Sequence, residues 1–149
     1  MRKRTLATLF VTLALTIWTA VPVHAVAYDC GVSSWAGWTA DTPGYYQVWA
    51  NAQSSCTPNA PEWQEAGVQL TVSPVSSPSG QPIVAQSFGP ACVFAQPCPT
   101  TTMTTPGTVR VQGGMWVFTR GAVSWVDVDG RQYNKAFNDF PWCGGQLPM

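Results

Sequence analysis

Five cysteines are the residues of this chain with the most evident chemistry, because thiols form disulfides, bind metals or act as nucleophiles. All of them follow an apolar N-terminal run: Cys30, Cys56, Cys92, Cys98 and Cys143. No two of them are spaced as C-x-x-C, and the only histidine of the chain is His24. A zinc site would lack its usual ligand set, so we predict no metal site and no cofactor.

The first 27 residues are typical of a secretory signal peptide. A basic start at residues 2–4 precedes an apolar run over about residues 6–21, and small residues follow at 25–27. An anchored transmembrane helix is the alternative, which the small residues and the lack of positive charge after the apolar run disfavour. We therefore expect a single secreted domain over residues 28–149, without a stable membrane anchor.

The predicted mature chain carries little charge. Four cations and seven carboxylates follow residue 27, which gives a net charge of −3. Four scattered cations cannot form the dense basic face that phosphates require, so a nucleic-acid partner is not expected. Because His24 falls in the predicted leader, catalysis by Ser-His-Asp or Cys-His is excluded. An enzyme would have to rely on carboxylates alone, and the sequence reveals no pair that faces across a cleft.

Export makes disulfides the expected state of the cysteines. Cys92 and Cys98 lie six apart in a loop with two prolines, so their Cβ atoms can come within bridging distance. Cys30 and Cys56 flank a predicted hairpin and form the second predicted pair. Cys143 is then unpaired, either as an inert thiol or as a covalent link to a partner chain. The alternative joins Cys143 to Cys30 and leaves Cys56 free.

Residues 108–137 have the clearest secondary-structure pattern of the chain. Apolar and polar residues alternate with period two on either side of Gly113-Gly114, which is typical of β-strands. Asp129-Gly130 predicts a hairpin with a type I′ turn, because both residues tolerate positive φ. Gly113-Gly114 is a second hairpin candidate. Gly121 indicates either a turn or a bend in one long strand.

Further strands are expected over residues 28–35, 45–52, 68–73 and 83–88, the third of them half-buried. A capping pattern predicts one short helical turn near residues 60–66. The total of about seven to nine short strands, separated by turn residues, predicts an all-β fold. We expect an antiparallel β-sandwich, either Ig-like or jelly-roll-like, that is stapled by disulfides.

Seven tryptophans remain after residue 27, more than so small a sandwich can bury with a partner for each indole N–H. Trp38, Trp49 and Trp63 lie in or beside turns or on the more polar face of a predicted strand, and Tyr45 shares that face with Trp49. Flat rings stack on the apolar faces of sugars, while neighbouring amides bond the hydroxyls. These four residues are the predicted ligand-binding residues.

The sequence therefore predicts a secreted, non-catalytic module that binds a protein or a glycan through exposed aromatic residues. An inhibitor or toxin-like effector is the first alternative, acting through the disulfide-held loop at residues 92–107. A small carboxylate-dependent hydrolase is the second alternative, and catalysis is the less favoured expectation.

Overall fold

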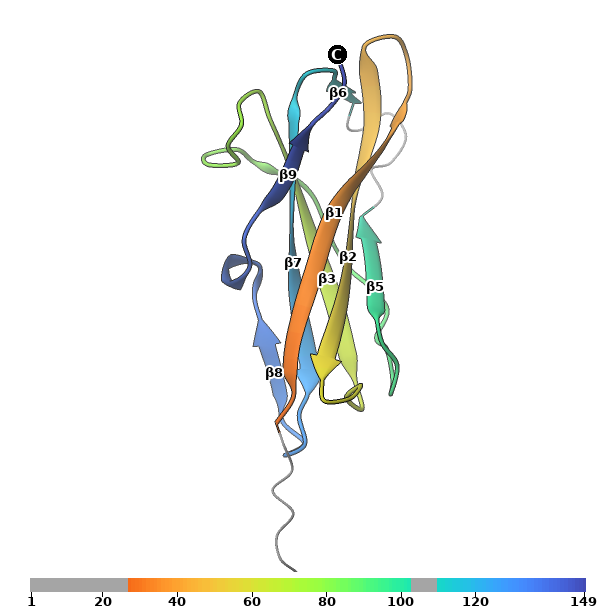
Figure 1. Cartoon of the computed structure of the whole chain (residues 1–149), viewed down its shortest axis with the longest axis vertical. Helices are drawn as coiled ribbons and strands as arrows, with labels where there is room; N and C mark the ends of the chain where they lie inside the picture. Colours follow the sequence, from red (N-terminus) through yellow and green to blue (C-terminus); the bar gives the residue numbers. More distant parts are fainter. Residues whose placement is uncertain (1–26, 103–109) are drawn as a thin grey trace, which may run out of the picture.

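A computed structural model describes residues 27–102 and 110–149 of the chain (Figure 1). The leader predicted over residues 1–27 lies outside this part except for its last residue, as does the predicted loop 92–107 from residue 103 onward. In the described residues, no helix has the length and apolar character needed to cross a membrane.

The described chain folds almost entirely into antiparallel β-strands, which confirms the predicted all-β class. Nine strands and one 3-10 helix, η1, follow each other in this order: β1 (Asp29–Ala40), β2 (Tyr45–Thr57), β3 (Gln64–Ser73), β4 (Ile83–Phe88), β5 (Cys98–Thr102), β6 (Arg110–Gln112), β7 (Trp116–Val126), β8 (Gln132–Lys135), η1 (Phe137–Asp139) and β9 (Cys143–Gln146).

The strands form two sheets that pack face to face, with β1 and β2 in front of β3 and β7 in Figure 1. The first sheet has the order β1-β2-β5, and β6 pairs with β2 further along the same edge as β5. The second has the order β4-β3-β7-β8, and β9 shares the edge of β7 with β8. This order resembles the Ig-like alternative, with β4 beside β3 instead of in the first sheet.

The inward faces of the two sheets enclose an apolar core. Its centre consists of side chains from both sheets and the C-terminal tail: Val48, Ala50, Ala52, Val68, Leu70, Val111, Val117 and Leu147. Nearer the start of β1, the disulfide between Cys30 and Cys56 packs with Val123 and Trp125. The alternation predicted along β2 is thereby confirmed, because Val48 and Ala50 face this core.

Gly121 lies in the middle of β7, which runs through it without a turn. A Cβ atom at Gly121 would lie 2.6 Å from the methyl carbons of Val32 on β1. Real Cβ atoms do not approach other carbons so closely, so the missing side chain lets β1 pack tightly onto β7. The glycine therefore serves sheet-to-sheet packing.

The half-buried character predicted for residues 68–73 is wrong, because β3 is buried on both faces. Val68 and Leu70 face the first sheet, whereas Gln69 and Thr71 on the opposite face are buried as well. β3 lies between β4 and β7 in its sheet. Its outer face must therefore be covered by side chains that the local pattern does not reveal.

Much of this cover comes from the segment that follows β8. A side chain at Gly67 would meet the rings of Phe88 and Phe137, whose centroids lie 5.6 Å apart. The Arg120 guanidinium donates from Nε to the Gln69 side chain at 2.9 Å and lies 4.2 Å from the centre of a Trp142 ring. The tail thus closes the second sheet from outside.

The helical turn predicted near residues 60–66 is also wrong, because β3 already begins at Gln64. The backbone of Gln64 donates to Cys92 O at 3.0 Å and accepts from Cys92 N at 2.8 Å. Its side chain donates from Nε2 to Ala95 O at 2.7 Å and accepts at Oε1 from Ser54 Oγ at 3.0 Å. These long-range bonds fix an extended backbone and override the local capping pattern.

The hairpin predicted at Asp129-Gly130 is confirmed, because β7 pairs with β8, but its predicted turn type is wrong. Gly130 N donates to Asp127 O at 2.8 Å, and Gly130 has a φ of 75° while Asp129 keeps a negative φ. Only one of the two residues therefore adopts the left-handed conformation, as in a type I turn followed by a glycine bulge.

Gly113-Gly114 does not form a hairpin. β6 before it pairs with β2, whereas β7 after it pairs with β3, so the glycine pair carries the chain from one sheet to the other. Gly114 has a φ of 84°, a conformation that suits glycine at such a corner.

Replacement of Gln64 by leucine is expected to lower the free energy of unfolding by about 2–4 kcal/mol, since the Ser54 hydroxyl and the Ala95 carbonyl lose their partner. Urea denaturation followed by tryptophan fluorescence measures this change. Gln53→Leu is the control, because Gln53 lies on β2 with an exposed side chain, and it should change stability by less than about 0.5 kcal/mol. Equal effects of the two substitutions would contradict the anchoring role of Gln64.

Candidate binding surface

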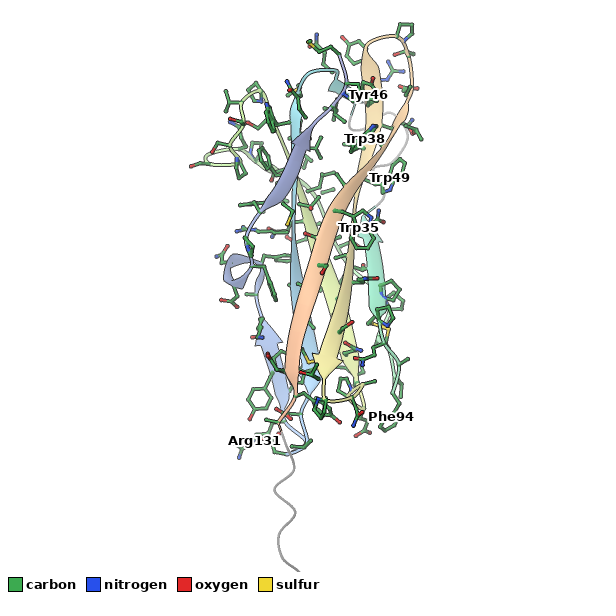
Figure 2. All side chains as sticks on the ribbon, in the orientation of Figure 1. Trp35, Trp38, Tyr46, Trp49, Phe94 and Arg131 are labelled. Atoms are coloured by element: carbon green, nitrogen blue, oxygen red, sulfur yellow. A yellow bond between two sulfur atoms is a disulfide. The ribbon has the colours of Figure 1, made fainter. Side chains whose placement is uncertain are left out.

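The four predicted ligand-binding residues do not form one site. Trp38, Tyr45 and Trp49 come from the hairpin of β1 and β2. Trp63 lies in the loop between β2 and β3, at the opposite end of the sandwich from the turn that joins β1 to β2 (Figure 1). The hairpin is therefore the place where aromatic side chains gather, as the labelled tryptophans in Figure 2 show.

The hairpin predicted between Cys30 and Cys56 is confirmed, and its turn lies at residues 41–44. Tyr45 N donates to Thr42 O at 2.9 Å, and Gly44 has a φ of 80° after Pro43. This geometry corresponds to a type II turn, in which proline and glycine occupy the two central positions. The turn sets the register in which Trp35 is opposite Asn51.

Trp35 and Trp49 share the outward face of the first sheet. Trp35 pairs with Asn51 and Gly37 pairs with Trp49 in the register of β1 and β2. The two indoles are therefore diagonal neighbours on one face, a separation that aromatic side chains can bridge. Trp35 is 46% exposed. Trp35 is not among the four predicted ligand-binding residues, although the alternation that begins at Cys30 places its side chain outside.

Gly37 supports the orientation of Trp49. A side chain at Gly37 would overlap the Trp49 indole, so the ring lies across the bare backbone of β1 and is half-buried there. The absence of a side chain thus provides a shallow seat for a flat ring on an otherwise regular sheet.

Polar side chains complete the same face of β2. Gln47, Asn51 and Gln53 alternate with the buried core residues, as do Tyr45 and Trp49. Tyr45 is 43% exposed at the hairpin end. We call the surface made by these five residues of β2 together with Trp35 the aromatic face.

Trp38 points away from the aromatic face and lines a cavity at the open edge between the two sheets. The cavity has a volume of about 250 Å³ and is bounded by residues of β1, β7 and β9, among them Trp38, Trp35, Ser34 and Cys143. Thr119 Oγ1 donates to Ser34 Oγ at 3.1 Å within its lining. The predicted binding residues therefore occupy three different places.

The structure contains the two disulfides that were predicted, Cys30–Cys56 and Cys92–Cys98. The first joins directly opposed residues of β1 and β2, and the second closes a short loop before β5. Cys143 on β9 is a free and exposed cysteine. The alternative in which Cys143 joins Cys30 does not occur.

The native protein is therefore expected to expose one reactive thiol per chain. Alkylation with iodoacetamide without reductant should add one label, located at Cys143 by mass spectrometry. Reduction and unfolding should raise the number for the same chain to five, because the four bridged cysteines become free. A Cys143→Ser variant should take up no label in its native state, and labelling of any other cysteine there would contradict the pairing.

The carboxylates of the described chain are mostly engaged in structural contacts. Asp29 bonds Lys135 Nζ at 2.8 Å, and this hydrogen bond lowers the pKa of Asp29. Asp41 bonds Arg110 Nε at 2.8 Å. Asp129 accepts from the backbone N–H of residue 131 and from the Tyr133 hydroxyl, and the backbone bond is the main reason that its pKa is lowered.

These contacts give no support to a carboxylate-dependent hydrolase, since a general acid needs a raised pKa. The hydrogen bond from the Tyr133 hydroxyl to Asp129 raises the pKa of Tyr133, because the tyrosine is the donor to a charged carboxylate. Across residues 27–102 and 110–149, no group of three or more histidine, cysteine, aspartate or glutamate side chains is arranged to hold a metal ion.

No protein-family model, curated protein or solved structure matches this chain. The sandwich architecture is shared by proteins of unrelated function, so the fold class does not define an activity. The surfaces of this molecule therefore carry the information about its function.

A methyl group at Gly37 is expected to displace the Trp49 indole from its seat. Gly37→Ala should shift the Nε1–H resonance of Trp49 in a proton–nitrogen correlation spectrum, assigned with a Trp49→Phe variant. Gly31→Ala is a matched control on the same strand, because no atom lies within 4 Å of the position that its Cβ would take. A shift of similar size in both variants would show that Gly37 does not seat the ring.

Proposed function

We propose that this protein is a non-catalytic binding module that engages a glycan through the aromatic face. The observation that carries the proposal is the pair of Trp35 and Trp49 on one outward sheet face, with the second ring seated over Gly37. Large flat rings offer apolar area at a small loss of side-chain freedom. They suit the apolar face of a sugar ring.

The polar residues around the two rings fit the same ligand. Gln47, Asn51 and Gln53 lie on the aromatic face, and each amide provides both donors and an acceptor. The charged groups nearest the hairpin turn, Asp41 and Arg110, are joined in a salt bridge. An uncharged surface with paired donors and acceptors is better suited to neutral sugar hydroxyls than to phosphate or an ionic peptide.

The module is proposed to act outside the cell. Two disulfides persist most readily in an oxidising compartment, and the predicted leader provides the export route. A protein ligand on the same face is the second version of the proposal, because tryptophan is frequent among the residues that dominate protein interfaces.

Titration of the mature protein with soluble polysaccharides, followed by tryptophan fluorescence, tests the proposal, together with co-sedimentation with insoluble cell-wall fractions. Trp35→Ala and Trp49→Ala should each weaken binding at least tenfold, because each removes a stacking ring. Trp63→Ala is the control, since Trp63 lies at the other end of the sandwich. The absence of binding to every polysaccharide, or a loss caused by Trp63→Ala alone, would refute the glycan version.

The inhibitor or toxin-like alternative depends on the loop at residues 92–107, of which residues 92–102 are described. One feature favours an interaction at this loop: two apolar side chains are exposed at its disulfide-closed tip, at Val93 and Phe94. The hydrolase alternative has no comparable observation in its favour among the described residues.

A further inference from the structure

The tip of the loop between β4 and β5 carries an exposed apolar pair. Val93 is 61% exposed and Phe94 is 70% exposed, and the disulfide between Cys92 and Cys98 closes the loop beneath them. Phe94 projects at the lower end of the molecule in Figure 2, far from Trp38 along the long axis. We call Val93 and Phe94 the Phe94 knob.

The loop is fixed by hydrogen bonds on both sides of its tip. Phe94 N donates to Pro61 O at 3.2 Å and to Glu62 O at 3.3 Å. Ala95 O accepts from the Gln64 side chain at 2.7 Å. The side-chain oxygen of Gln96 accepts from Cys56 N at 2.9 Å. The backbone of the loop is thus tied to the segment that joins β2 to β3.

Phe94 has a φ of 47°, in the left-handed region that a bulky L residue rarely adopts. Such a conformation persists only where the surrounding structure fixes it, and the bonds from Pro61, Glu62 and Gln64 to this loop provide that constraint. The protein therefore holds an aromatic side chain in the solvent with a fixed backbone, instead of letting it fold back onto the sandwich.

A fixed backbone favours a shaped receptor, because an interaction with fluid lipid gains nothing from a defined loop geometry, whereas insertion into a protein pocket does. The charges at this end point the same way. Glu62 is exposed next to the knob, whereas in the neighbouring hairpin Asp127 accepts from Tyr28 N at 3.1 Å and Asp129 lies 4.0 Å from Arg131. Val126 N donates to Trp63 O at 3.0 Å and so joins that hairpin to the same segment.

We propose that the Phe94 knob docks into an apolar pocket of a partner protein whose rim carries lysine or arginine residues. The apolar pair supplies the buried contact, and the exposed Glu62 carboxylate beside it complements the basic rim. This surface is separate from the aromatic face, so the inference goes beyond glycan binding and does not depend on it.

The first experiment places a photo-reactive benzoylphenylalanine at position 94 of the full mature chain, with position 75 as the control. Val75 is also apolar and 55% exposed, but it lies in the loop between β3 and β4 at the other end of the second sheet. Irradiation with the surface and culture proteins of the producing organism should give a discrete adduct from position 94 alone. Excess wild-type protein should compete, and Phe94→Ala should not.

The second experiment uses the protein identified by mass spectrometry, purified and titrated by calorimetry. Phe94→Ala should weaken its affinity at least tenfold and Val75→Ala should leave it unchanged. Glu62→Gln and added NaCl should each weaken the affinity several-fold, as expected for a carboxylate that meets a basic rim. The double variant Cys92→Ser with Cys98→Ser keeps Phe94 but frees the loop, and it should also bind more weakly while its circular dichroism spectrum stays that of the native sandwich.

Each other occupant gives a distinct result. Phe94-dependent co-sedimentation with vesicles of phosphatidylcholine and phosphatidylglycerol would replace the protein partner by a lipid surface. A Phe94-dependent dimer in sedimentation velocity would assign the contact to a second copy of this chain. The absence of any adduct specific to position 94, or an identified partner that binds Phe94→Ala as tightly as wild type, would overturn the proposal. Trp35→Ala should bind the identified partner protein as tightly as wild type does. This outcome shows that docking of the Phe94 knob does not depend on glycan binding by the aromatic face.

Discussion

The buried amide of Gln64 is the contact on which much of this molecule depends. It is completely buried, so its polar atoms must find partners within the protein. The partners of its side chain and backbone come from two segments: Ser54 on β2, and Cys92 with Ala95 in the disulfide-closed loop. One side chain and its backbone thus align the first sheet, the start of β3 and the loop that carries Phe94. An apolar residue of the same size would fill the space but leave the Ser54 hydroxyl and the Ala95 carbonyl without their partner.

Two glycines determine how the two faces of β1 are used. On the inward side, Gly121 of β7 leaves room for Val32, which brings the sheets into close contact. On the outward side, Gly37 leaves room for the Trp49 ring beside Trp35. β1 is an edge strand that pairs only with β2 among the described strands. The two glycines therefore determine both how β1 packs on β7 and how the Trp49 ring lies on the aromatic face.

The sequence predicts the features that local patterns control. Period-two alternation predicts the strands and the buried side of β2. The short spacing of Cys92 and Cys98 predicts one disulfide, and the hairpin flanked by Cys30 and Cys56 predicts the other. The features that it misses depend on distant contacts. The predicted helix near residue 62 fails because Cys92 bonds the backbone of Gln64, and β3 is more buried than predicted because the segment after β8 covers it. For the aromatic face, the sequence identifies Tyr45 and Trp49, but the place of Trp35 depends on the register of the hairpin.

The aromatic face and the Phe94 knob differ in the physical basis of the recognition they would support. The first lies on paired strands, where the ladder of backbone hydrogen bonds fixes the spacing of rings and amides. The second lies on a loop, where a disulfide and bonds to Gln64 and Glu62 supply the rigidity that a strand would otherwise give. Both surfaces are ordered before any ligand arrives, so less conformational entropy is lost on binding. With so few charges on the chain, the two proposed interactions would depend mainly on buried aromatic area and directed hydrogen bonds, with a smaller electrostatic contribution from the exposed Glu62 beside Phe94.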